Sequence, residues 1–140
     1  MSFKAILCYV AAACGGLASW LFGTWNTALA VLMVCLALDY ATGMIVAGVF
    51  HKSPKSENGG LESRAGWKGL ARKVGTLCLV ALANLVDKLT GTAFIRGAVV
   101  IGYCTNEILS ILENLGLMGL PIDKLLKNAV DLLRKKEETK

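Results

Sequence analysis

Six polar side chains interrupt the apolar segment 98–117 at spacings that suit an α-helix. They are Tyr103, Asn106, Glu107, Ser110, Glu113 and Asn114. Four of them form one stripe along a helix, because they are separated by four, three and four residues: Tyr103, Glu107, Ser110 and Asn114. Carboxylate, amide and hydroxyl groups in such a stripe can hydrogen-bond between the helices of one bundle, or they can form a self-association or pore-lining face. The spacing alone does not separate these interpretations.

Two more acids lie within apolar segments. Asp39 is followed at i+3 and i+4 by Thr42 and Gly43, and this combination favours close contact between helices. Asp87 is near the end of its segment, where it can pair with Lys88 or reach water. Because a charged side chain at mid-membrane costs about 2.5–3.5 kcal/mol on insertion scales, we expect all these acids to face a partner or water. They are candidates for an oligomer contact or a pore lining.

No arrangement of side chains in the sequence is typical of catalysis. The single His51 lies in a polar segment without a carboxylate or cysteine pattern around it, and P-loop, GxSxG, HExxH and dinucleotide-binding patterns are absent. The five cysteines all lie in apolar runs and form no CxxC pair, which predicts free thiols. We therefore expect a protein that is not an enzyme and that binds neither a cofactor nor a metal ion.

The composition of the chain predicts a membrane protein. Hydrophobic residues make up 55% of its 140 residues, charged residues make up 18%, and there are 15 glycines. Apolar residues and glycine together reach roughly two-thirds, against about 45–50% in soluble domains. A chain of this length cannot bury so much apolar surface in its own core. We expect an all-α integral membrane protein.

Charge-free runs and turn residues divide the chain into membrane spans. The 34 residues between Lys4 and Asp39 carry no charge, and one span needs about 20. Gly23–Asn26 breaks this run as a tight hairpin, and Trp20 and Trp25 beside it are expected at the membrane interface. The transmembrane domain then covers residues 1–120, with spans at about 3–22, 27–50, 74–94 and 98–117. Three spans, with the first segment in the interface, are the alternative.

The polar interval 51–73 is predicted to be a cytoplasmic loop. It carries six basic residues and two acids. Arg64, Lys68 and Arg72 recur every four residues beside Trp67, which is typical of a short interfacial helix that contacts lipid phosphates, and Lys73 follows them. Positive charge that only fixes the topology is the alternative interpretation.

Residues 121–140 are predicted to form an amphipathic helix with a charged tail. Apolar residues between Ile122 and Leu133 share one face, and charged residues occupy the other. This helix would lie on the membrane or on a partner. Because the 51–73 loop and the tail each carry six basic residues, the positive-inside rule places both of them, and both termini, in the cytoplasm.

Several motifs together resemble a phage-holin family that also contains the toxin-release holins of clostridia. In chain order they are Gly23–Thr27 (GTWNT), Leu38–Gly43 (LDYATG), Gly66–Lys73 (GWKGLARK), Leu85–Asp87 (LVD), Tyr103–Asn114 (YCTNEILSILEN) and Gly119–Ile122 (GLPI). The resemblance covers roughly residues 20–127. It implies a phage or prophage protein that oligomerises in the host bacterial cytoplasmic membrane and permeabilises it. An endolysin, or in some bacteria a toxin, would then leave the cell and the host would lyse.

The expected partners follow from this resemblance and from the composition. They are other copies of the chain, membrane lipids and an antiholin, with functional coupling to an endolysin or an exported toxin, and nucleic acid is not among them. Two other functions stay open on the residues alone. One is a small ion-coupled transporter that relays protons through Asp39 or Glu107. The other is a membrane regulator that forms no pore, such as an antiholin.

Overall fold

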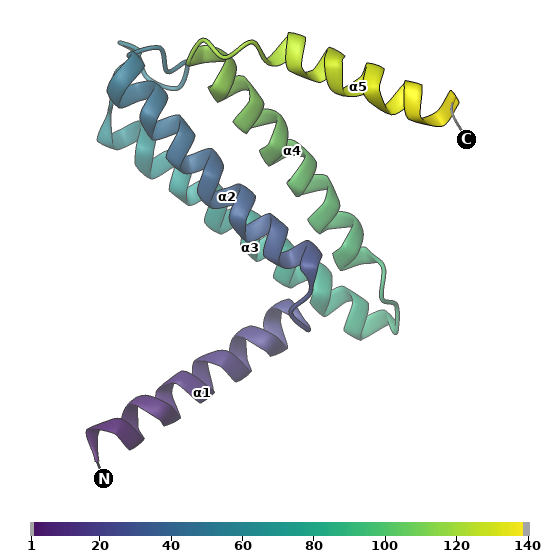
Figure 1. The fold of residues 1–140 in the computed structure, drawn as a ribbon. Coiled ribbons are helices and arrows are strands. Elements are labelled where there is room, and N and C mark those ends of the chain that lie inside the picture. Colours follow the sequence, from purple (N-terminus) through teal and green to yellow (C-terminus); the bar gives the residue numbers. More distant parts are fainter. Residues whose placement is uncertain (1, 139–140) are drawn as a thin grey trace.

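The computed structural model describes residues 2–138, and this part of the chain is all α-helical, as the sequence predicts. The elements are α1 (Phe3–Phe22), α2 (Thr27–Ile45), the π-helical segment η1 (Val46–Phe50), α3 (Ser63–Thr90), α4 (Ile95–Leu117) and α5 (Ile122–Glu138). Helices α2, α3 and α4 lie side by side, whereas α1 and α5 project from opposite ends of this bundle (Figure 1). Four helices, namely α1, α2 continued by η1, α3 and α4, are long and apolar enough to cross a membrane.

The bundle has two ends that differ in their connections. At the turn end, residues 23–26 join α1 to α2 and residues 91–94 join α3 to α4. At the loop end, residues 51–62 join η1 to α3, and residues 118–121 join α4 to α5.

Local sequence signals explain where the helices begin and end at the turn end. The side chain of Asn26 accepts a hydrogen bond from the backbone N–H of Leu29, which caps the N-terminus of α2. Helix α3 ends at Gly91, whose left-handed backbone (φ 71°) is the conformation that glycine adopts most readily at a helix C-terminus. The connection is therefore only four residues long, and α3 and α4 run antiparallel.

Helix α3 starts eleven residues before the span predicted to begin at residue 74. The segment 63–73, expected as part of a loop with a short interfacial helix, is continuous with the span. Gly66 and Gly69 weaken the helical propensity there, but the ring of Tyr40 from α2 packs over both glycines, within 4 Å of the position that a Cβ atom would occupy. Tertiary packing thus compensates for the low propensity. Only residues 51–62 form the loop.

The apolar core lies toward the turn end of the bundle. Leu32, Val80 and Val100, one from each helix of the bundle, are almost completely buried. Leu29 and Leu36 extend the same cluster along α2. Each helix therefore contributes to one interior, and most other apolar side chains face outward, as expected for a bundle surrounded by lipid.

Helix α1 does not form the tight hairpin with α2 that the sequence predicts. The chain turns at Gly23–Asn26 as expected, but α1 then leads away from the bundle (Figure 1), and none of its residues is buried. Gly23 has φ 77°, and a Cβ atom there would lie 2.6 Å from both Arg96 and Asn84. The direction in which α1 leaves is thus set by contacts with α3 and α4 rather than by packing against α2.

Helix α5 leaves the loop end through a sharp connection. Gly119 adopts φ 93°, a conformation that side-chain-bearing residues rarely take. The apolar residues Leu125, Leu126 and Val130 are exposed, and so are Asp123, Lys124, Lys127 and Asp131 on the charged face. The predicted charged tail extends over residues 134–140. Its side chains, and residues 139–140 altogether, lie outside the described part of the chain.

Candidate functional site

A lysine joins two buried acids that come from different helices of the bundle. Lys73 on α3 places its Nζ atom 2.7 Å from Oδ2 of Asp39 on α2 and 2.6 Å from Oε2 of Glu107 on α4. The exposed fractions of the three side chains are only 13%, 8% and 9%. One ammonium group therefore links all three helices of the bundle near the middle of α2 and α4.

An amide extends this network toward the loop end. Nδ2 of Asn114 donates to Oδ1 of Asp39 at 3.2 Å and to Oγ1 of Thr42 at 2.9 Å. The Thr42 hydroxyl in turn donates to the backbone carbonyl of Leu38. Gly43, one residue further along α2, also lies against Asn114. The face predicted from Asp39, Thr42 and Gly43 is thus the face on which α2 contacts α4.

The charges of this network restrict how the bundle can come apart. Two carboxylates and one ammonium that are largely buried stabilise one another only while they stay together, because each alone would pay a large desolvation cost. With all three ionised, the set of Asp39, Lys73 and Glu107 carries one net negative charge. Separation of any helix from the other two exposes an unpaired charge to lipid. The network therefore favours one arrangement of α2, α3 and α4.

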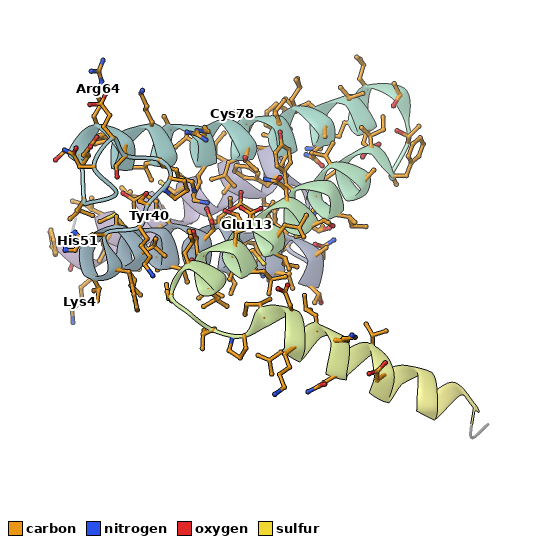
Figure 2. The ribbon with its side chains drawn as sticks, turned by 90° about the horizontal axis from the view of Figure 1, so that it is seen from above. Lys4, Tyr40, His51, Arg64, Cys78 and Glu113 are labelled. Carbon is orange, nitrogen blue, oxygen red and sulfur yellow. The ribbon has the colours of Figure 1, made fainter. Side chains whose placement is uncertain are left out.

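An open groove of about 840 Å³ reaches this network from the loop end. Its walls come from α2, the 51–62 loop, α3 and α4, and Tyr40 and Glu113, labelled in Figure 2, line it. Asp39, Lys73 and Glu107 are also among its lining residues. Water from the loop end can therefore approach the buried charges, while the turn end is closed by the apolar core.

Asp87 has a different role from the other acids. Its carboxylate accepts hydrogen bonds from the backbone N–H groups of Ile95 and Arg96, at 3.1 and 2.8 Å, and from the hydroxyl of Thr92. These contacts cap the N-terminus of α4, where a negative charge also complements the helix dipole. Asp87 thus fixes the α3–α4 turn, and it does not pair with Lys88.

The same end of the bundle holds α1 through polar contacts. Asn84 donates to the backbone carbonyls of Trp20 and Leu21, and Lys88 also reaches the carbonyl of Trp20. The ammonium of Lys88 lies 4.8 Å from the centre of the Trp20 ring. Arg96 donates to the carbonyl of Thr24. Side chains of α3 therefore satisfy two C-terminal carbonyls of α1, and Arg96 of α4 holds the turn that follows α1.

Comparison with known proteins identifies the family. The model of the bacteriophage holin family matches residues 16–135. The chain belongs to this family. A Bacillus phage phi105 protein named as a probable holin is 29% identical to this holin-family chain over 111 residues, which cover 79% of the chain and 76% of the phage protein.

Two bacterial relatives are more similar than the phage protein and cover more of the chain. An uncharacterized protein of Halalkalibacterium halodurans is 36% identical over 137 residues, which cover 94% of the holin-family chain and 96% of the relative. An uncharacterized 14.9 kDa protein of Clostridium perfringens is 37% identical over 125 residues, which cover 88% and 89% of the two chains. No solved structure matches the chain.

The structure divides the polar stripe of this holin-family protein into two sets. Glu107 and Asn114 are buried against α2 and α3, and Tyr103 and Ser110 are half-buried beside them. Asn106 and Glu113 are exposed, and they line the groove. The first set supports the interpretation of hydrogen bonding within one bundle, while the second is available for contacts with other molecules.

The basic residues predicted to face lipid also fall into two groups, one exposed and one pointing into the bundle. Arg64, Lys68 and Arg72 are exposed, and Figure 2 shows Arg64 pointing outward from α3. Lys73, which was assigned to the same group from the sequence, instead points into the bundle and pairs with two acids. One residue further along a helix is a rotation of about 100°, which is why Lys73 leaves the face of its neighbour. The three tryptophans, Trp20, Trp25 and Trp67, are all exposed.

Sequence reasoning missed the partner of the buried acids. A signal was available, because an acid buried in a span needs a counter-ion, and Lys73 is the last basic residue before the apolar part of α3. It also missed Tyr40, since nothing local shows that its ring covers Gly66 and Gly69.

Proposed function

We propose that this chain is a phage or prophage holin that oligomerises in the bacterial cytoplasmic membrane and permeabilises it. An endolysin, or in some bacteria an exported toxin, would then leave the cell. The family match over residues 16–135 and the probable holin of phage phi105 support the holin role. Four helices of spanning length support residence in a membrane.

One observation from the structure carries the proposal of controlled permeabilisation. Lys73 pairs with both buried acids, Asp39 and Glu107, so the interior of a single subunit in lipid holds no unpaired ion. The groove nevertheless leaves a polar surface open beside these charges. A subunit with both features can accumulate in the membrane and can present a polar face when copies assemble.

We also propose that both termini and the loop end lie in the cytoplasm. The loop and the tail carry the excess of basic residues, while the turn at residues 23–26 has none. Arg64 and Lys68 would then meet lipid phosphates at the inner surface. Trp20 and Trp25 would anchor the outer interface, and Trp67 the inner one. In a variant without native cysteines, a reagent outside the cell should label a cysteine at Thr24 and miss one at Glu57. Labelling of position 57 would reverse the orientation.

Induced expression tests the function directly. Host cells should stop growing abruptly after a delay and then admit a membrane-impermeant dye, and a co-expressed endolysin without its own export signal should lyse them. A transporter would instead give an effect that depends on a substrate, and an antiholin-like regulator would give neither dye entry nor lysis. Either result would reject the proposal.

Liposomes then measure the size of the lesion. The purified chain, reconstituted into vesicles that contain dyes and labelled proteins of increasing size, should release an endolysin-sized protein if the lesion passes folded proteins. Release of small dyes alone would restrict the lesion to ions and small solutes, and would contradict direct endolysin release.

A further inference from the structure

Helix α4 presents two polar side chains to the groove that have no partner within the subunit. Asn106 lies near the middle of α4, and Glu113 lies seven residues later on the same face, with the exposed Leu109 between them. In the described part of the chain, neither side chain makes a hydrogen bond or an ion pair. They differ in this respect from Glu107 and Asn114, which face the bundle on the adjacent side of the same helix.

The opposite wall of the groove carries an exposed cation. Arg72 on α3 lines the groove, and it makes no ion pair among the residues that the structure describes. The ion pair between Lys73 and Glu107 shows that these two residues lie at the same height along the antiparallel helices α3 and α4. Glu113 is six residues, or about 9 Å, from Glu107 toward the loop end. The long side chain of Arg72, adjacent to Lys73, can extend toward that level.

In its exposed charged side chains the groove therefore has an acidic wall on α4, with Glu113, and a cationic wall on α3, with Arg72. The half-buried Glu62 lies where the loop joins α3. A second copy related by a two-fold axis along the membrane normal would face this groove with its own groove, at the same depth and with the walls exchanged. Each acidic wall would then meet a cationic wall, and the contact would occur twice because a two-fold interface is self-complementary.

From this charge arrangement we propose that two copies pack groove to groove, with Glu113 of one subunit against Arg72 of the other and Asn106 close to the two-fold axis. This inference rests on the proposed oligomerisation and names its contact. An anionic lipid in the groove would satisfy Arg72 but would leave Glu113 and Asn106 unpaired. Helix α5 points away from the bundle (Figure 1). A second copy satisfies all three side chains, which is the requirement for polar groups on a spanning helix.

Cross-linking between two differently tagged chains tests the contact. In a background without native cysteines, one chain carries Glu113→Cys and the other carries Arg72→Cys, so that a mixed-tag product can form only between subunits. The groove-to-groove dimer predicts strong mixed-tag cross-linking with a short bifunctional thiol reagent. The matched control is Ile108→Cys, since this exposed position lies on another side of α4.

The controls separate failure of the contact from failure of the function. Equal cross-linking through positions 108 and 113 would overturn the inference. The inference would also be overturned if no 72–113 product formed in membranes where an amine-reactive reagent captures oligomers of the wild-type chain. In that case lipid or α5 would occupy the groove. A wild-type chain that neither oligomerises nor admits dye would reject the proposed function itself.

Charge reversal provides a test in which all native cysteines are kept. Glu113→Arg should shift the monomer–dimer equilibrium toward monomer by about threefold to tenfold, the range expected for one or two polar contacts in lipid. The double variant Glu113→Arg/Arg72→Glu restores opposite charges and should recover the dimer. No shift in the single variant, or no recovery in the double variant at equal membrane level, would overturn the contact.

Discussion

The two halves of the bundle are held together by different interactions. Toward the turn end, Leu32, Val80 and Val100 form a closed apolar core. Nearer the loop end, Lys73 joins Asp39 and Glu107 in a network that an open groove approaches. In water the apolar half would dominate, but lipid is as apolar as leucine, so burial of that half gains little beyond packing. The charged half has no favourable alternative in lipid. It therefore specifies which helices stay together.

Removal of the central cation should have the largest effect. Lys73→Met leaves Asp39 and Glu107 buried without a counter-ion, and we expect a loss of about 3–5 kcal/mol in the free energy of unfolding. A titration with denaturing detergent in bicelles measures this loss. Lys68→Met, an exposed change on the same helix, is the matched control and should cost less than about 0.5 kcal/mol. A loss of similar size in both variants would remove the distinction between the two halves.

Replacement of the whole charged set sharpens the same comparison. The triple variant Asp39→Leu/Lys73→Met/Glu107→Leu removes all three charges together, and apolar replacement of a complete buried ion network is often neutral or stabilising. Its stability should therefore return close to that of the wild type, although it should lose the polar surface beside the groove.

The apolar half should tolerate truncation better than a soluble core does. Leu32 is fully buried, and Leu32→Ala should cost about 2 kcal/mol, at the lower limit of the 2–5 kcal/mol found in soluble cores, because lipid solvates the leucine in the separated state. Leu38→Ala, at an exposed position of α2, is the control for the same titration. A cost near 5 kcal/mol would show that packing at the turn end outweighs the charged network.

Loss of the α4 cap should have an intermediate effect that stays at the turn end. Asp87→Ala removes three hydrogen bonds to the α3–α4 turn, and we expect a loss of about 0.5–2 kcal/mol. Asp87→Asn keeps an acceptor and should lose less. Hydrogen exchange of residues 92–96 should increase in Asp87→Ala, while exchange around Lys73 stays unchanged. Equal increases in both regions would show that the two halves are coupled.

Removal of the amide from the network should have the smallest effect. Asn114→Leu breaks the contacts with Asp39 and Thr42 but leaves the ion pairs in place. Hydrogen bonds between membrane helices contribute about 0.6 kcal/mol on average and up to about 1.7 kcal/mol, and the loss should lie in this range. Asn106→Leu, on the groove side of the same helix, should leave subunit stability unchanged and weaken only the proposed groove-to-groove dimer, which analytical ultracentrifugation in detergent resolves.

Much of the fold follows from local patterns in the sequence. Charge-free runs predict the two helices before residue 50, and the turn signals around Gly23 and Gly91 mark the connections of the turn end. The start of α3 at Ser63 could not be predicted in this way. Basic residues and two glycines before residue 74 favour a loop locally, and the compensating contact with Tyr40 comes from another helix.

The candidate site was predictable as a set of polar residues but not as an arrangement. Helical periodicity places Glu107 and Asn114 on one face, and the cost of charge in lipid implies a partner. Both contacts of Lys73 are with residues 34 positions away in the sequence, and such pairing depends on how three helices pack. For the same reason, Asp87 could be recognised as an acid near a helix end, but its role as the cap of α4 required the turn geometry.

An exchange of charges within the ion network tests the central claim most directly. Lys73→Glu alone would bring three carboxylates together, and Glu107→Lys alone would place two ammonium groups beside Asp39, so each single variant should lose most of its folded protein. The double variant Lys73→Glu/Glu107→Lys restores one cation between two acids, with the cation on α4. The level of detergent-stable folded protein in membranes should recover to near that of the wild type in this variant. If the double variant is no more stable than the less stable single variant, the claim that this ion network holds α2, α3 and α4 together is contradicted.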